Sequence, residues 1–305
     1  MRQVLPARRV RHALIVGVVA VACAVPGCTD ATDPPRRDGG AGSVETSESG
    51  DGRPDAALPA DCSADAVPER LVPEVLGERP HDPSAFTQGL LLLDGVLYES
   101  TGLEGESSVR AVDPSTGEVL RRSDLDPSSF GEGLTGVGKD RLVQLTWKEG
   151  RAEVRDRSDL RVVDEHRYDG EGWGITTLAD GTLVMSDGSA SLSVRDPDDF
   201  SLQERWQVAR VDGDADRLNE LEWDGDRIWA NRWQTDEIVR IDPRCRAVDG
   251  VVDASRLTER AAQAASAPID VLNGIAHVPG SDRFLVTGKL WPVVYEVRFV
   301  PAERG

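Results

Sequence analysis

Five short segments of the chain place a polar or aromatic side chain beside glycine or a small apolar residue, just ahead of a hydrophobic stretch. They read HDPSAFTQGL (81–90), FGEGL (130–134), EGWGIT (171–176), LNELEW (218–223) and LNGIA (272–276). In the second, Glu132 stands between two glycines. A carboxyl enclosed by backbone and Trp rings loses water, which raises its pKa toward the range useful for proton transfer. The sequence allows equally a Glu that only caps a turn, so Glu132 is a candidate acid–base group with a structural alternative.

The chain uses arginine almost throughout and has only three lysines, one of which is Lys289 in the segment TGKLWP (287–292). An ammonium is a compact point charge, whereas a guanidinium is a planar fork, and the two are not interchangeable in a site. The choice of lysine here indicates a need for the compact cation. The alternative is a solvated lysine on a strand.

An internal repeat of about 45 residues supplies the elements that would position these groups. Each copy begins with a two-residue turn followed by strands of alternating apolar residues; the turns are Asp94-Gly95, Lys139-Asp140, Asp180-Gly181, Asp224-Gly225 and Ser281-Asp282. The pattern predicts an all-β fold, a five-bladed β-propeller over residues 61–305, rather than a sandwich. In a propeller the loops entering the innermost strands share one face, so the five segments are expected to converge.

Two irregular segments complete the predicted ring. Residues 254–267 lengthen the last interval and predict either one short helix or a surface excursion. Residues 70–76 (RLVPEVL) are a candidate outer strand for the last blade, since that blade runs out of chain near Val300.

The first 27 residues are typical of a secretory signal. Four arginines precede an uncharged apolar run at 13–25, which is shorter than the roughly 20 residues of a spanning helix. Val25 to Cys28 resembles a bacterial lipobox with Cys28 as the lipidation site, although Pro26 departs from the usual small residue and leaves simple cleavage as the alternative. We therefore expect an exported protein that is lipid-anchored to the bacterial cell envelope, extracytoplasmic, and in contact with the membrane only through Cys28.

Residues 28–60 consist mostly of Asp, Pro, Gly, Ser and Glu. Such a segment buries too little apolar surface to offset its ordering entropy, so we expect a disordered tether ahead of the propeller.

The four cysteines divide by position. Cys23 lies in the signal and Cys28 would carry lipid, which leaves Cys62 and Cys245 in an oxidising compartment. We expect a disulfide between them, the alternative being two free thiols.

Charge and motif content exclude several classes of protein. The chain has 35 Lys plus Arg against 54 Asp plus Glu, a net charge of −19, which argues against nucleic-acid binding. No P-loop, dinucleotide fingerprint or GxSxG occurs, and His81, His166 and His277 lack metal-ligand spacing. We expect no cofactor, although a structural metal on the propeller axis leaves no trace in sequence. A closed ring with an acidic surface favours a monomer.

Eight short motifs, in order, resemble the plant-type glutaminyl-peptide cyclotransferases of plants and bacteria, which are five-bladed propellers. They are FTQGL (86–90), FGEGLT (130–135), LTW (145–147), GWGI (172–175), LNELEW (218–223), IWANRW (228–233), LNGIA (272–276) and TGKLWP (287–292). The resemblance covers residues 81–299. It implies an enzyme that converts the N-terminal Gln of peptides or proteins into pyroglutamate and releases ammonia, without the zinc of the animal-type enzymes.

The resemblance also implies roles for single residues. Glu132 matches the family's catalytic Glu and would move protons between the α-amine and the leaving nitrogen. Lys289 matches an active-site Lys that would stabilise the tetrahedral intermediate or hold Glu132 in place. Two amides would bind the substrate's amide and amine, and aromatic rings would shield it from water: Gln88, Asn219, Phe86, Phe130, Trp147, Trp173 and Trp233. Trp291, on the expected strand face of Lys289, would line or border the pocket.

Two other functions compete with this one. A non-catalytic exported propeller could bind peptides or cell-envelope partners through the same face. A metal-dependent lactonase-type propeller would need several carboxylate or Asn ligands converging on the channel, whereas the entrance segments supply mostly Trp, Gly, Phe and one Glu.

Overall fold

The computed structural model describes residues 59, 62 and 66–303, which belong to the second of two compact units, Ala56–Gly305. The predicted signal segment (1–27), Cys28 and nearly all of the predicted tether (28–60) lie outside the described residues.

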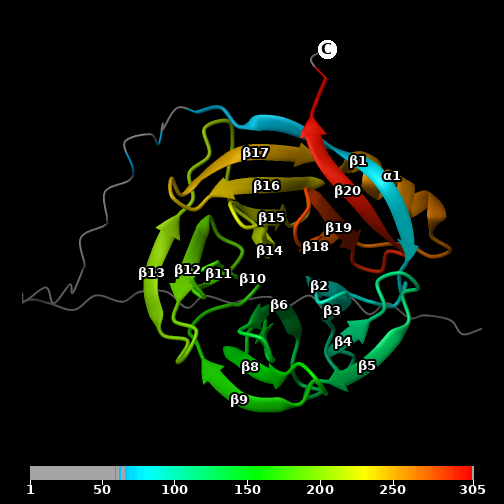
Figure 1. Cartoon of the computed structure of the whole chain (residues 1–305), viewed down its shortest axis with the longest axis vertical. Helices are drawn as coiled ribbons and strands as arrows, with labels where there is room; N and C mark the ends of the chain where they lie inside the picture. Colours follow the sequence, from blue (N-terminus) through cyan, green and yellow to red (C-terminus); the bar gives the residue numbers. More distant parts are fainter. Residues whose placement is uncertain (1–58, 60–61, 63–65, 304–305) are drawn as a thin grey trace, which may run out of the picture. The chain divides into compact units, whose positions relative to one another are not determined.

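The described chain is all-β, with one short helix (Figure 1). Three sheets have four strands each, and neighbouring strands in them are antiparallel. The first contains β2 (Thr87–Leu93), β3 (Val96–Thr101), β4 (Ser108–Val112) and β5 (Val119–Asp124). The second contains β6 (Gly131–Val137), β7 (Arg141–Thr146), β8 (Arg151–Asp156) and β9 (Val162–Arg167). The third contains β10 (Ile175–Thr177), β11 (Leu183–Ser186), β12 (Ser191–Arg195) and β13 (Leu202–Gln207).

The remaining strands form one eight-stranded sheet in the order β14-β15-β16-β17-β1-β20-β19-β18. Its strands are β14 (Leu218–Trp223), β15 (Ile228–Arg232), β16 (Glu237–Asp242), β17 (Ala247–Asp253), β1 (Glu69–Pro80), β20 (Val293–Pro301), β19 (Arg283–Gly288) and β18 (Leu272–His277).

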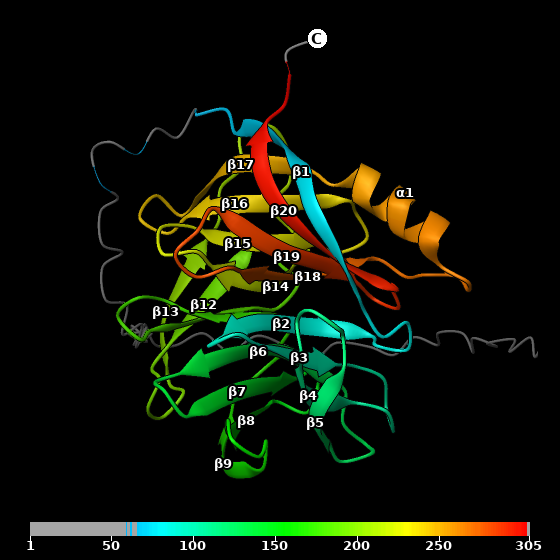
Figure 2. The same ribbon diagram turned by 45° about the vertical axis from the view of Figure 1, so that its right-hand side comes forward.

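The sheets are arranged around a common centre, which β2, β6, β10, β14 and β18 line (Figures 1 and 2). These inner strands contact one another in cyclic order, while outer strands such as β5 and β9 are largely exposed. The fold is therefore β-propeller-like, as the repeat predicts.

Local sequence explains the hairpins. Asp94 and Gly95 join β2 to β3 with φ of 49° and 78°, the positive values that a two-residue type I′ turn requires and that Asp-Gly adopts readily. Apolar residues alternate along the strands and pack between neighbouring sheets, as in the cluster of Leu91, Tyr98 and Leu142.

Glu220 of β14 fastens the centre of the ring. Its two carboxylate oxygens accept backbone hydrogen bonds from Leu90 of β2, at 3.2 Å, and from Ile275 of β18, at 3.0 Å. Burial raises the pKa of Glu220 well above its ordinary value, and the negative charge of Glu222 adds to this effect. One side chain thus bridges three inner strands.

The ring closes with the strand that sequence analysis proposed. β1 pairs antiparallel with β20, from Leu71 opposite Pro301 to Pro80 opposite Val293, and parallel with β17 through Glu69 to Leu71. The predicted disulfide is also confirmed, because Cys62 and Cys245 are bonded with their Cα atoms 5.3 Å apart. Residues far apart in the sequence are thereby joined at one side of the ring.

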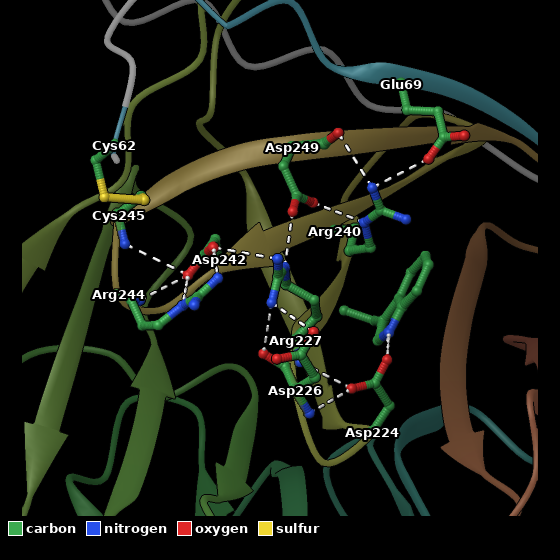
Figure 3. A network of polar contacts seen from close by, with 11 residues as sticks. Cys62, Glu69, Asp224, Asp226, Arg227, Arg240, Asp242, Arg244, Cys245 and Asp249 are labelled. Atoms are coloured by element: carbon green, nitrogen blue, oxygen red, sulfur yellow. Dashed lines mark hydrogen bonds and ion pairs between the residues drawn. A yellow bond between two sulfur atoms is a disulfide. The ribbon is translucent and has the colours of Figure 1, made fainter. Parts of the chain in front are cut away.

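A network of charged side chains crosses this junction (Figure 3). Arg240 Nε donates to Asp249 at 2.6 Å and Arg240 Nη2 donates to Glu69 of β1 at 3.2 Å. Arg227 Nε also donates to Asp249, at 2.7 Å, and its Nη2 lies 3.2 Å from Asp242. We call this group, together with the disulfide, the closing seam.

Helix α1 (Ser255–Ala264) occupies the interval that predicted a short helix or an excursion. It packs on the ring through Leu257 and Ala261, the two buried residues of the helix. Within the part of the chain that the structure describes, no helix has the length and apolar character needed to cross a membrane.

Candidate active site

One pocket, of about 340 Å³, collects most of the predicted site residues, a volume at the lower end of small-molecule sites. Its lining residues are Phe86, Gln88, Phe130, Glu132, Trp147, Trp173, Asn219, Trp233, Gln234, Asp270, Val271 and Lys289. Four of the five entrance segments contribute to this lining, and the fifth, residues 272–276, lies directly behind it, where Asn273 donates to Gln88 Oε1 at 3.2 Å. Lys289, Trp147 and Trp233 reach the pocket from other parts of the chain.

β-bulges at the start of the inner strands aim the polar side chains into the pocket. The register shifts between Thr87 and Gly89 in β2, and between Gly131 and Leu134 in β6, so that Gln88 and Glu132 lie within the bulges. Asn219 lies in a similar irregularity of β14. A bulge leaves one residue out of the ladder and redirects its side chain, which explains why these residues point into the pocket.

Close approach of the inner strands fixes the backbone on either side of Glu132. Gly133 donates from N to the Trp173 carbonyl at 2.7 Å, and Gly131 donates to Ser107 Oγ at 3.0 Å. A Cβ on Gly133 would lie only 2.7 Å from the backbone N of Ile175. Glycine is required there, since any side chain would force the sheets apart.

The Glu132 carboxyl is buried and only half satisfied. The residue is 5% exposed; Oε1 accepts a hydrogen bond from Gln88 Nε2 at 3.1 Å, while Oε2 is buried without a partner. Burial raises the pKa of Glu132 well above the ordinary carboxyl range, although Lys289 opposes this shift. The negative charge of Glu171 raises the pKa further. With this raised pKa, the carboxylate of Glu132 is a stronger base than an ordinary carboxylate.

Lys289 lies in the turn after β19 and is 4% exposed. Its Nζ lies 4.8 Å from the centre of the Phe86 ring, a cation–π distance. The turn is held by backbone hydrogen bonds with Val271, Asp270 and Ala85. Burial lowers the pKa of Lys289, while Glu132 and Asp270 partly restore it. An ammonium with so little water around it acts strongly on a nearby negative charge.

The amides differ in what they bind. Gln88 is occupied: it donates to Glu132, and its Oε1 accepts from Asn273 Nδ2 at 3.2 Å. Asn219 lines the pocket, and its buried Oδ1 has no hydrogen-bond partner in the structure. Gln88 thus orients the carboxyl, whereas Asn219 has an acceptor available to a ligand.

The aromatic walls form two groups. Phe130 contacts Phe86 edge-on, with ring centroids 6.1 Å apart, and Trp147 at 5.5 Å. Trp173 and Trp233 meet edge-on at 5.4 Å. Such walls exclude water from the polar groups between them.

Trp291 does not line the pocket, contrary to its prediction as a substrate-binding residue. Its side chain is fully buried in the core, and Nε1 donates to the backbone oxygen of Asp270 at 2.9 Å. The prediction assumed that strand alternation continues past Lys289, but β19 ends at Gly288 and Leu290 has φ of 63°. Trp291 therefore lies behind the pocket wall.

Sequence reasoning missed four residues of this region. Gln234, Asp270 and Val271 line the pocket from loops. Glu171, one residue of a quoted entrance segment, accepts hydrogen bonds from the indoles of Trp147 at 2.8 Å and Trp173 at 3.0 Å. The signal for Glu171 was its position two residues before Trp173 in a segment already expected at the pocket.

No group of three or more His, Cys, Asp or Glu suited to a metal ion occurs among the residues that the structure describes.

The fold is β-propeller-like, and its pocket holds a buried carboxyl and a buried ammonium between aromatic walls. Residues 54–299 match the glutamine cyclotransferase family, and the chain belongs to that family. It is 42% identical over 235 residues to the glutaminyl-peptide cyclotransferase of Arabidopsis thaliana, covering 75% of this chain and 72% of the plant protein. The crystal structure of Myxococcus xanthus glutaminyl cyclase superposes with a TM-score of 0.72 at 38% identity, covering 77% of this chain and all of that one. The resemblance seen in the eight motifs is thereby confirmed.

Proposed function

We propose that this chain is a glutaminyl-peptide cyclotransferase in which Glu132 is the proton-transfer group. The reaction turns an N-terminal Gln of a peptide or protein into pyroglutamate and releases ammonia. One observation carries the assignment of Glu132: in a member of this family, the buried carboxyl lines the pocket and has one oxygen without a partner.

Proton transfer follows from the environment of Glu132. The substrate's α-amino group has a pKa of about 7.7–8.0, and the raised pKa of Glu132 brings the carboxyl closer to that range. The carboxylate takes a proton from the α-amine as its nitrogen bonds to the side-chain amide carbon. It then returns the proton to the amide nitrogen, so that the carbon–nitrogen bond breaks and ammonia leaves.

Lys289 and Asn219 act on the other charges of the reaction. As the amide carbon becomes tetrahedral its oxygen gains negative charge, which the ammonium of Lys289 stabilises in a site with little water. The unpartnered Oδ1 of Asn219 accepts a hydrogen bond from the α-amine and so holds the amine nitrogen toward the amide carbon.

These groups need no metal or cofactor in the proposed mechanism. Phe86, Phe130, Trp147, Trp173 and Trp233 surround the Gln side chain and keep water from the intermediate.

The remaining features of the chain complete the proposal. We propose five blades, with the eight-stranded sheet divided between β17 and β1, in a domain of residues 61–305. A signal (1–27), a tether (28–60) and a lipid anchor at Cys28 would place a monomeric enzyme on the outer side of a bacterial membrane.

A single assay tests the activity. The purified protein is incubated with Gln-Ala-amide, and product is detected by mass and by released ammonia, with and without a chelator. We expect chelator-insensitive pyroglutamyl product. No product would favour the non-catalytic, peptide-binding propeller, and product lost on chelation would overturn the metal-free mechanism.

A further inference from the structure

A second cavity, of about 470 Å³, adjoins the candidate active site. It lies between the chain after β15, helix α1 and the segment before β18. The described residues that line it are Gln234, Thr235, Asp236, Thr258, Ala262, Ile269, Asp270 and Val271. The helix that follows β17 therefore has a face on this cavity, a feature that the cyclisation chemistry does not use.

The two cavities share part of their walls. Gln234, Asp270 and Val271 line both. Another large cavity, lined by Glu222 and His277, has no lining residue in common with the active site. The second cavity is thus continuous with the rim of the active site.

The connecting rim is held in a fixed shape. Asp270 and Val271 exchange backbone hydrogen bonds with Lys289, each 2.9 Å long, and Trp291 supports the Asp270 carbonyl from behind. On the other side, Thr258 Oγ1 of α1 donates to Asp236 Oδ1 at 2.6 Å, and the Ala254 N donates to the Asp236 carbonyl at 2.9 Å. The helix and the rim are therefore fastened to the elements that position the site.

The charge of the second cavity has one sign. Asp236 and Asp270 contribute carboxylates, and none of the described residues that line it is basic. Arg260, on the same helix, forms an ion pair with Glu78 of β1 instead. Partly solvated carboxylates attract a cation weakly and repel an anion to a similar degree.

We propose that this cavity is the subsite for the residue that follows the N-terminal Gln, and that it favours a basic side chain over an acidic one there. The proposal rests on the proposed function. When the α-amine and the Gln side chain occupy the first pocket, the Gln carbonyl and the next residue lie outside it. From there the next residue reaches the second cavity by passing Gln234 and Asp270, which line both cavities, and it then lies against α1.

Selectivity between peptides with a basic and an acidic second residue tests the effect of the cavity's negative charge. kcat/KM is measured for Gln-Arg-amide, Gln-Gly-amide and Gln-Glu-amide, and we expect that order, with about a threefold to tenfold ratio between the first and last. Asp236→Asn keeps an oxygen acceptor for Thr258 and should lower this ratio about twofold. Glu259→Gln removes an equal charge from the same helix away from the cavity, so it should leave the ratio unchanged.

A second pair of variants tests whether the second residue of the substrate occupies this cavity. Ala262→Phe fills the cavity from α1 and should raise KM for Gln-Arg-amide about threefold or more, with Gln-Gly-amide much less affected. Ala264→Phe places the same side chain on the helix outside the cavity and serves as its control.

The outcomes separate the two proposals. If no Gln peptide releases ammonia, the proposed function fails. If all three peptides react with equal kcat/KM, or if Ala262→Phe and Ala264→Phe behave alike, the activity stands and the subsite is overturned.

Discussion

The closing seam and the active-site pocket both bring charged side chains together, but they treat those charges in opposite ways. In the seam, Arg240 and Arg227 each lie within hydrogen-bonding distance of carboxylates. In the pocket, Glu132 accepts one hydrogen bond, from the Gln88 amide. The ammonium of Lys289 lies over the ring of Phe86. The charged groups of the seam are therefore paired with opposite charges, whereas the Glu132 carboxyl of the pocket keeps an oxygen without a hydrogen-bond partner.

The buried polar atoms of the pocket show the same contrast. Glu132 Oε2 and Asn219 Oδ1, from two residues that line the pocket, are buried without hydrogen-bond partners, as is Oδ1 of Asn273, which contacts Gln88 behind the lining. A buried polar atom left unpaired costs roughly 1–3 kcal/mol of stability. The unpaired atoms of Glu132 and Asn219 therefore lower the stability of the fold, whereas the disulfide of the seam raises it.

The strongest test of this comparison is Glu132→Gln. We expect turnover to fall by about 10²–10⁴-fold, because an amide cannot take and return the proton. The melting temperature should not fall, because the variant removes a poorly solvated carboxyl. Ammonia release and thermal unfolding measure the two effects, and a variant with full turnover would show that Glu132 is not the proton-transfer group.

Breaking the closing seam should lower stability and leave activity unchanged. Replacing both Cys62 and Cys245 by Ser opens a bridge between residues 183 positions apart, which should lower the free energy of unfolding by about 2–5 kcal/mol. Denaturant titration measures this loss. kcat/KM under native conditions should stay at the wild-type value, and a large fall in it would mean that the seam also shapes the pocket.

The pH profile tests the charges that surround Glu132. Activity requires the carboxylate, so kcat/KM should fall as the pH drops through the raised pKa of Glu132. Lys289 lowers this pKa and Glu171 raises it. Lys289→Met should therefore move the acidic limb to higher pH, and Glu171→Gln should move it to lower pH.

Lys139→Met, an exposed lysine in the turn after β6, is the matched control for the pH experiment. Shifts of the same sign in the Lys289 and Glu171 variants would contradict the assignment of the limb to Glu132.

The smallest effect is expected at a single seam arginine. The Arg240 side chain is 23% exposed, so Arg240→Met should lower the free energy of unfolding by only about 0.5–1 kcal/mol. kcat should not change. Urea unfolding and the standard assay check both statements, and a larger loss would indicate that the network acts cooperatively.

Much of the fold could be predicted because its signals are local and repeated. Asp94-Gly95 identifies a hairpin turn without any knowledge of the rest of the chain. The closing strand and the disulfide followed from counting, since the last repeat lacked an outer strand and two cysteines were left over.

The site was predicted less completely because its shape depends on irregular backbone. Trp291 was misplaced since alternation holds only within a strand, and the positive φ of Leu290 ends that rule. Gln88 lines the pocket as expected, but no sequence signal showed that a bulge also brings its amide to Glu132. Asp270 and Gln234 reach the pocket from loops, whose course no periodic pattern reports.

The pairing of β1 with β20 sets the order of events during biosynthesis. Among the described strands β1 is made first and β20 last, so β1 stays unpaired along this edge while about 200 residues are synthesised. Pairings this distant in sequence form slowly. A chain truncated before Val293 would leave β1 without a partner at that edge and would be exposed to proteases and to aggregation.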